Sequence, residues 1–142
     1  GCLPADGRLA GGVMTRAEWL ASLKVGDEVG VLTGGPSWLP GWIGTVSRFT
    51  KAGKIWVSEG DKIDRACFMP NGDGYPAGGG RLTTADIVER RNARILADAR
   101  FRDACGQLER VASGTRIPDG FDYFTHITAI RAIVAAIQGG KP

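Results

Sequence analysis

The chain has 142 residues, with 18 lysines and arginines against 15 aspartates and glutamates and a net charge of +3. This length indicates a single domain of ordinary size. A hydrophobic fraction of 43% and a charged fraction of 23% exclude a chain that is disordered throughout, collagen-like or a coiled coil. The unusual count is 22 glycines, about twice the average usage, and it predicts many turns between short elements.

The first part of the chain is expected to contain an unstructured stretch and a short helix. Residues 1–13 show neither a helical nor a strand period, and Met14 follows them like a translation start. We therefore expect residues 1–13 to be a leader, a tag or a disordered arm. Thr15 and Glu18 have the spacing of a capping box, in which each side chain satisfies a free backbone N–H. A helix of two turns, ending near Lys24, is predicted after this box.

Short apolar segments separated by turn signals come next. Val29 and Val31 alternate with other residues in the way expected of a half-buried strand. The glycine-rich stretch 71–80 lacks the pattern of a phosphate-binding loop, so we expect a flexible hairpin tip or linker there. Strands of this length, each followed by a turn, predict a small antiparallel barrel or sandwich. The further predicted strands are 42–49, 55–58 and 63–69.

The pattern becomes helical after the strands. Thr83 is placed to cap a helix that has Asp86 in its first turn. The helix is expected to continue to about residue 112, with a bend near Gly106. A last helix is predicted over residues 122–138, where apolar residues form a single stripe at 4-3-4-3 spacing.

Together these elements predict an α+β fold with a short N-terminal helix, a small antiparallel β-barrel and a C-terminal helical hairpin. Residues 14–83 would form the barrel with its preceding helix. Residues 84–138 would form a two-helix extension that packs on the barrel, and residues 139–142 a disordered tail. The apolar stripe of the last helix, from Tyr123 to Ile137, could instead form a homodimer.

Two parts of the sequence resemble known families. Val25-Gly-Asp-Glu-Val-Gly-Val31, followed by Gly41-Trp-Ile-Gly-Thr-Val46 and Ile55-Trp-Val57, resembles the KOW motif and its SH3-like barrel relatives. Such barrels bind RNA, ribosomes, RNA polymerase, DNA or peptides. The wider layout, including Arg81-Leu-Thr-Thr-Ala-Asp-Ile87 at the start of an arginine-rich helix, is similar to small, mostly uncharacterised phage and prophage proteins. That resemblance implies a viral protein in the cytoplasm of a host cell.

Catalytic, metal-binding and membrane motifs are missing from the sequence. His126 is the only histidine, and the cysteines Cys2, Cys67 and Cys105 lie too far apart for a zinc knuckle. No Ser-His-Asp or Cys-His set can be assembled, and no run of about 18 apolar residues could span a membrane. We therefore expect a non-enzymatic cytoplasmic protein with no catalytic residues, no cofactor, no metal and no membrane partner.

The positive charge is concentrated in two segments. Residues 81–102 carry six arginines against three acidic residues, and residues 42–65 carry five basic residues against three acidic ones. Guanidinium groups suit phosphates, and a basic stripe is typical of nucleic-acid binding, although such side chains also form ordinary solvated, ion-paired faces. The first interpretation is a phage-type adaptor that binds DNA, RNA or a nucleoprotein complex. Its candidate residues are Arg48, Lys51, Lys54, Arg90, Arg91 and Arg94.

The second interpretation is a protein-interaction module. Trp38 and Leu39 lie in a loop rich in proline and glycine, and an exposed Trp-Leu pair would be a hot spot for a protein partner. That partner would be a host or phage protein, with this chain acting as an inhibitor of a host enzyme or defence system or as a virion component. Trp56 is expected to be partly buried, and aromatic rings near the basic residues could stack on bases.

Overall fold

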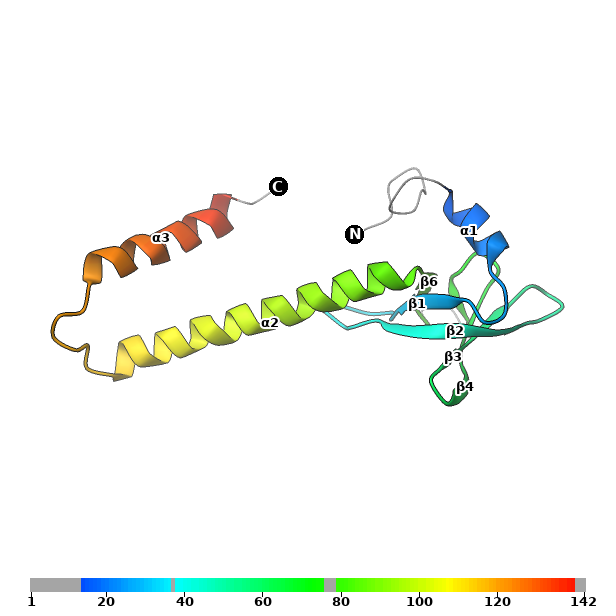
Figure 1. Ribbon diagram of the computed structural model, residues 1–142, viewed down its shortest axis with the longest axis horizontal. Helices are drawn as coiled ribbons and strands as arrows, with labels where there is room; N and C mark the ends of the chain where they lie inside the picture. The colour runs from blue at the N-terminus through cyan, green and yellow to red at the C-terminus, as the bar shows by residue number, and fades with distance from the viewer. Residues whose placement is uncertain (1–13, 37, 76–78, 140–142) are drawn as a thin grey trace. The chain divides into compact units, whose positions relative to one another are not determined.

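The computed structural model describes residues 14–36, 38–75 and 79–139. The predictions for residues 1–13 and for most of the C-terminal tail lie outside these residues. The fold is α+β, and the described residues form three helices and one antiparallel sheet (Figure 1). The elements are α1 (Arg16–Ser22), β1 (Glu28–Leu32), β2 (Trp42–Phe49), β3 (Ile55–Glu59), β4 (Lys62–Phe68), β5 (Gly74–Tyr75), β6 (Arg81–Thr83), α2 (Ala85–Gly114) and α3 (Tyr123–Gly139).

The short helix α1 begins where the capping signal predicts. The Thr15 hydroxyl oxygen accepts a hydrogen bond from the Glu18 backbone N–H at 3.1 Å, which satisfies one of the free donors of the first turn. Leu20 on α1 and Leu23 just after it are buried against the sheet. The cap and the burial of these two leucines together hold a helix of seven residues, a length that is marginal in isolation.

The sheet has six strands in the order β5-β4-β3-β2-β1-β6 and curls into a half-barrel. Its two end strands are linked, because Asp73 forms an isolated bridge with Arg81 and the Leu82 N–H donates to the Gly72 carbonyl at 2.7 Å. The hairpin turn predicted for residues 71–80 is present at the start of this stretch, where β4 turns back to pair with β5, and Gly80 at its other end accepts a hydrogen bond from Gly74.

One face of the half-barrel forms the hydrophobic core. Val29, Val57, Phe68 and Leu82 come from four different strands and are fully buried. Successive residues of a strand point to opposite faces, so the alternation seen in the sequence places these side chains together. Burial of such branched and aromatic groups is the main favourable contribution to folding.

The first turns of α2 are held against β1 and β2. Val88 is fully buried, and its side chain lies beside Gly30 and Gly41. A Cβ added at Gly30 would collide with Val88 Cγ2, and one added at Gly41 would collide with the Val31 carbonyl oxygen and press on Val88. The Asn92 side chain also exchanges two hydrogen bonds with the Gly41 backbone, accepting from its N–H at 2.9 Å and donating to its carbonyl at 3.0 Å. The two glycines and Asn92 thus allow close approach of helix and sheet.

The start of α2 differs from the prediction by one residue. Thr83 belongs to β6 and is 1% exposed, so it does not cap the helix. Thr84 immediately precedes α2, and its side chain hydrogen bonds to Asp86, which lowers the pKa of that carboxyl below its usual value. The helix continues through Gly106 to Gly114, so the predicted bend does not interrupt it.

The chain divides into two compact units, residues 1–101 and residues 102–142, with the boundary inside α2. In the second unit, Asp122 caps α3 by accepting the Thr125 backbone N–H at 3.1 Å. Phe121 stacks on His126 with 4.8 Å between ring centroids. No residue of α3 is buried, and the predicted packing of α3 on the barrel stays a prediction.

Candidate functional site

Four residues on neighbouring strands form a line across the outer face of the sheet, which we call the cross-strand row. Arg48 in β2 pairs with Trp56 in β3, Trp56 pairs with Cys67 in β4, and Cys67 pairs with Tyr75 in β5. Directly paired residues share one face of a sheet, and the alternation along β3 and β4 places this face opposite the core. The small Cys67 is buried, whereas Tyr75 is 52% exposed.

A cation lies over each of the two large aromatic rings in this row. The Arg48 guanidinium carbon is 4.8 Å from the centre of the Trp56 ring, and Lys54 Nζ is 3.7 Å from the centre of the Tyr75 ring. Both distances fall in the range of cation–π attraction. Lys54 ends the turn between β2 and β3, where its N–H donates to the Thr50 hydroxyl at 3.0 Å, so the turn itself holds the lysine backbone in place.

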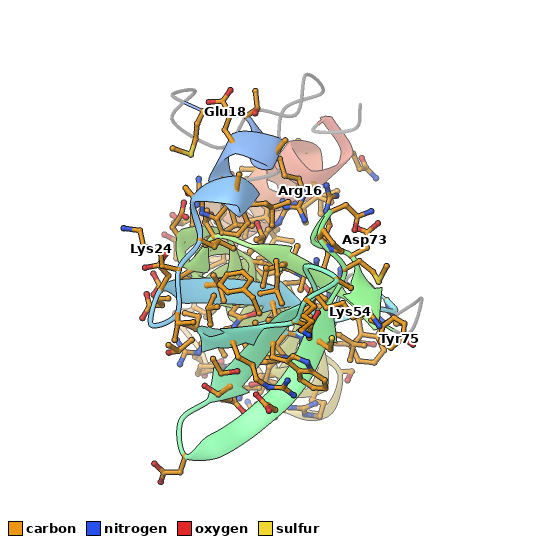
Figure 2. All side chains as sticks on the ribbon, turned by 90° about the vertical axis from the view of Figure 1, so that its right-hand side faces the viewer. Arg16, Glu18, Lys24, Lys54, Asp73 and Tyr75 are labelled. Atoms are coloured by element: carbon orange, nitrogen blue, oxygen red, sulfur yellow. The ribbon has the colours of Figure 1, made fainter. Side chains whose placement is uncertain are left out.

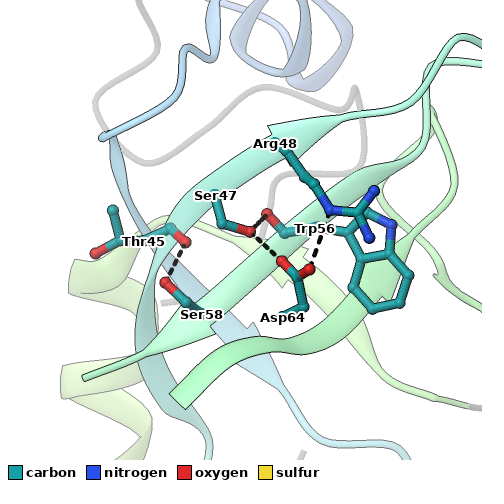
Figure 3. A network of polar contacts seen from close by, with 6 residues as sticks. All are labelled: Thr45, Ser47, Arg48, Trp56, Ser58 and Asp64. Atoms are coloured by element: carbon teal, nitrogen blue, oxygen red, sulfur yellow. Dashed lines mark hydrogen bonds and ion pairs between the residues drawn. The ribbon is translucent and has the colours of Figure 1, made fainter. Parts of the chain in front are cut away.

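Arg48 is positioned by a bulge in β2. The pairing between β2 and β3 shifts between Val46 and Arg48, which leaves Ser47 as an extra residue and re-aims the side chain after it. Ser47 Oγ lies 2.7 Å from Asp64 Oδ1 and 3.1 Å from the Trp56 carbonyl oxygen, and Arg48 Nε donates to Asp64 Oδ2 at 3.0 Å (Figure 3). This network holds the guanidinium beside the Trp56 ring.

Asp64 is the acidic centre of that network. Its φ of 55° places it in the left-handed region, which aspartate and asparagine tolerate better than most other residues. The hydrogen bond from Ser47 and, with a smaller effect, the hydrogen bond and charge of Arg48 lower the pKa of the Asp64 carboxyl below its ordinary value. The carboxylate is therefore ionised at neutral pH and keeps Arg48 in position.

Asp64→Asn should lower the free energy of unfolding at about pH 7 and lower it by less at about pH 3. The folded-state pKa lies below the unfolded one, so the stabilisation by Asp64 is fully present above about pH 5 and is lost as pH falls through the folded pKa. Asparagine keeps the tolerance for positive φ. Urea unfolding of both proteins at the two pH values measures the difference.

Asp61→Asn is the matched control for this substitution, because Asp61 is exposed in the neighbouring turn. It should leave stability nearly unchanged at both pH values. If Asp64→Asn lowers the free energy of unfolding equally at both pH values, the role given to the ionised carboxylate is contradicted.

The structure divides the predicted basic residues into two groups. Arg48, Lys51 and Lys54 lie together at the end of β2 and in the turn that follows it. The arginines of α2 lie near the opposite end of β2, because Asn92 holds the helix at Gly41. At ~3.3 Å per residue, the strand separates the two groups by roughly 23 Å. The prediction of one basic face is therefore wrong for the combined set.

The helix arginines also differ from one another. Arg90 is paired with Asp86 at 2.8 Å, an exposed pair of the kind that contributes little to stability. Arg91 is half-buried and Arg94 is exposed. The solvated, ion-paired alternative therefore describes Arg90 best.

Tyr75 and Arg65 were not singled out from the sequence, and Trp42 was considered only as one of the aromatic rings that could stack on bases. Tyr75 lies in a strand of two residues, too short to show any alternation. Trp42 carries the Arg65 guanidinium 4.3 Å from its ring centre, and Arg65 is also ion-paired with Glu59. The pairing of each ring with its cation depends on the register between strands, and no local pattern in the sequence specifies that register.

The two residues of the predicted protein-contact pair, Trp38 and Leu39, differ in their exposure to solvent. Trp38 is 67% exposed, as expected for an aromatic contact residue. Leu39 is half-buried, its N–H donates to the Pro36 carbonyl at 3.1 Å, and its side chain lies against Gly35. Only the tryptophan of the pair is therefore presented to solvent.

Other classes of site were sought within the same parts of the chain. Among the described residues, no three histidine, cysteine, aspartate or glutamate side chains are grouped in a way that could hold a metal ion. None of the described helices combines the length and the apolar character needed to cross a membrane. We compared the chain with protein-family models, with curated proteins and with solved structures, and none of the three comparisons found a match.

Proposed function

We propose that the protein is a non-enzymatic, phage-type adaptor whose barrel is SH3-like, of the KOW type, and binds single-stranded nucleic acid in the cytoplasm of a host cell. The observation that supports this most is the cross-strand row, in which Trp56 and Tyr75 lie on one face with a cation over each ring. Aromatic rings accept stacked bases, and lysine and arginine next to them bind the phosphates between those bases.

The spacing of the row suits a strand of nucleic acid better than a duplex. Trp56 and Tyr75 are two strands apart, which corresponds to roughly 10 Å across a sheet. Two splayed bases could stack on these rings while Lys54 moves from the Tyr75 ring to a phosphate group, and Arg48, held by Asp64 through its Nε, offers its terminal nitrogens to a second phosphate. Lys51, in the adjacent turn, extends the positive surface along the same path. Replacing ring contacts by phosphate contacts is favourable because charge-assisted hydrogen bonds are the stronger interaction.

Trp56→Leu should weaken the binding of short single-stranded DNA and RNA oligonucleotides by about 5- to 150-fold, the loss of one stacked base at ~1–3 kcal/mol. Fluorescence anisotropy of a labelled oligonucleotide at low salt measures it. Trp38→Leu removes an exposed tryptophan outside the row and should leave affinity unchanged. If no oligonucleotide binds at low salt, or if the two variants bind equally, the proposal is wrong.

The charge contribution is tested in the same titration. Lys54→Ala should reduce the salt dependence of binding by about 0.7 in the slope of log K against log salt, the value for one phosphate contact on a single strand. Lys24→Ala removes the same charge from the loop before β1. In Figure 2, Lys24 lies at the left of the sheet, whereas Lys54 and Tyr75 lie at the right. The control should leave the slope unchanged.

A second candidate function rests on the exposed Trp38. A tryptophan that is 67% exposed in a loop with prolines has the features of an anchor for a protein partner. This function would replace the first if oligonucleotides fail to bind and a host or phage protein binds the native chain but not Trp38→Leu. Trp56→Leu is then the control, and it should retain the protein partner.

A further inference from the structure

An apolar stripe runs along α3, the helix drawn from orange to red in Figure 1. Its members recur at alternating intervals of four and three residues, which places their side chains on one side of the helix. We call this surface the α3 stripe, and it consists of Tyr123, Ile127, Ile130, Val134 and Ile137. Each of these residues is between 43% and 60% exposed. The stripe is therefore open to solvent along its whole length, which is unfavourable for apolar side chains.

The area of this apolar surface is that of a protein interface. Phe124, which is 87% exposed, and Ile133, which is 46% exposed, widen the α3 stripe on its two flanks. Together these side chains expose roughly 800 Å², which is the area that each partner contributes to an interface of standard size. Monomeric proteins rarely expose an apolar patch larger than a few hundred Å². The α3 stripe therefore marks an interaction surface.

The described residues of the same chain leave the α3 stripe without an equivalent apolar partner. Within residues 102–142, the end of α2 contributes only Leu108 and Val111 as large apolar side chains, and both are more than half exposed. Two such side chains are too few to cover a stripe of five. The hydrophobic core of the half-barrel, as far as the chain is described, contains no residue of α3. The stripe is thus not needed to complete either the end of α2 or the barrel core.

The opposite side of α3 favours another helix over a lipid surface as the cover. That side carries Thr125, Thr128 and Ala132 with further alanines between them, whereas a helix that lies on a membrane presents lysines and arginines there. α3 has one arginine, Arg131, and no lysine. The repeat of four and three residues is the spacing of a coiled-coil seam, in which each side chain fits between those of a facing helix with the same spacing. A helix with this spacing is present on every other copy of the chain, as its own α3.

We propose that the α3 stripe is the interface of a homodimer, in which α3 of one copy packs against α3 of a second copy. A two-fold interface brings the same patch of both copies together, so each stripe buries the other. α3 contains no acidic residue, and Arg131 and His126 lie beside the stripe rather than in it. The contact therefore buries no unpaired charge, which would be costly. The inference is independent of nucleic-acid binding at the cross-strand row.

Sedimentation velocity of the full chain over a wide range of concentrations tests the proposal. The mass should rise to that of two chains as the concentration increases. Ile130→Glu should weaken dimerisation by at least about 100-fold, because each copy would bury an unpaired carboxylate in the middle of the stripe. Ala132→Glu places the same charge on the opposite side of α3 and should leave the dimer unchanged. A monomer at every concentration, or equal effects of the two variants, would overturn the proposal.

A second variant makes the test independent of an introduced charge. Ile127→Ala combined with Val134→Ala removes apolar contacts from the stripe while raising the helix propensity of α3. This double variant should weaken dimerisation by at least about tenfold, and circular dichroism confirms that its helix content is retained. Two results for a monomeric native chain would each replace the second copy by another cover: binding to vesicles of phosphatidylcholine and phosphatidylglycerol, or slow hydrogen exchange along α3 through packing on its own chain. Either result would overturn the homodimer.

Discussion

Phe68→Ala is expected to lower the free energy of unfolding of the barrel by about 3–5 kcal/mol, the usual cost of removing a buried phenylalanine side chain. Phe68 is 0% exposed and pairs with Ile55 across β3 and β4 in the centre of the core. The loss combines the transfer free energy of the ring with the cavity that it leaves, because the curved sheet cannot collapse to fill the space. A loss of this size is a large part of the ~5–15 kcal/mol that stabilises a domain.

The measurement is urea unfolding followed by circular dichroism. Met69→Ala is the matched control, because Met69 is the next residue and is 37% exposed, so its removal should cost well under half as much. If Phe68→Ala cost less than about 1 kcal/mol, the core described for the half-barrel would be wrong.

Gly30→Ala is expected to destabilise the contact between α2 and the sheet by about 1–3 kcal/mol, the range for overpacking a tight site. A Cβ at Gly30 would lie 2.5 Å from Val88 Cγ2 and 2.6 Å from the Thr84 carbonyl oxygen. The valine can change its rotamer, but the Thr84 carbonyl belongs to the backbone that leads into α2. The first turn of α2 must therefore move away from β1, which strains the paired hydrogen bonds between Asn92 and Gly41.

Limited proteolysis near the start of α2 and urea unfolding measure this effect. Gly106→Ala is the matched control, since it is the same substitution in the middle of α2 with nothing closer than 3.5 Å, and it should stabilise the helix by about 0.5–1 kcal/mol. The double variant with Val88→Ala should recover only part of the Gly30→Ala loss, because the clash with the Thr84 carbonyl remains. Full recovery would contradict the role of the backbone.

The same variant bears on the nucleic-acid proposal. The cross-strand row lies on β2 to β5, and α2 is held at the other end of β2. Gly30→Ala should therefore leave oligonucleotide affinity unchanged even where it loosens the start of α2. A clear loss of affinity would show that the α2 arginines belong to the same surface as the row.

Elements with a strong local signal were predicted correctly. The cap at Thr15 and the alternation around Val29 and Val31 led to α1 and β1, and the stripe from Tyr123 led to α3. β5 and β6 were not predicted, because strands of two and three residues carry no period. Their existence depends on hydrogen bonds to partners elsewhere in the chain.

In the candidate site, too, the residues with a local signal were predicted and the contacts between distant segments were not. Arg48, Lys51 and Lys54 were found from charge alone, and the structure places them together. The grouping of these residues with the three arginines of α2 was wrong, because sequence charge does not tell which end of β2 the helix contacts. The Asn92 amide and the absence of a side chain at Gly41 decide that contact.

The abundance of glycine, the capping box and the apolar alternation were enough to predict short antiparallel strands with helices at both ends, since each of these signals acts within a few residues. Tertiary structure alone decided that Trp56 and Tyr75 share a row with Arg48, and that no residue of α3 is buried. Register and burial arise from contacts between residues far apart in the chain, and a shift of one residue would move every side chain of a strand to the other face.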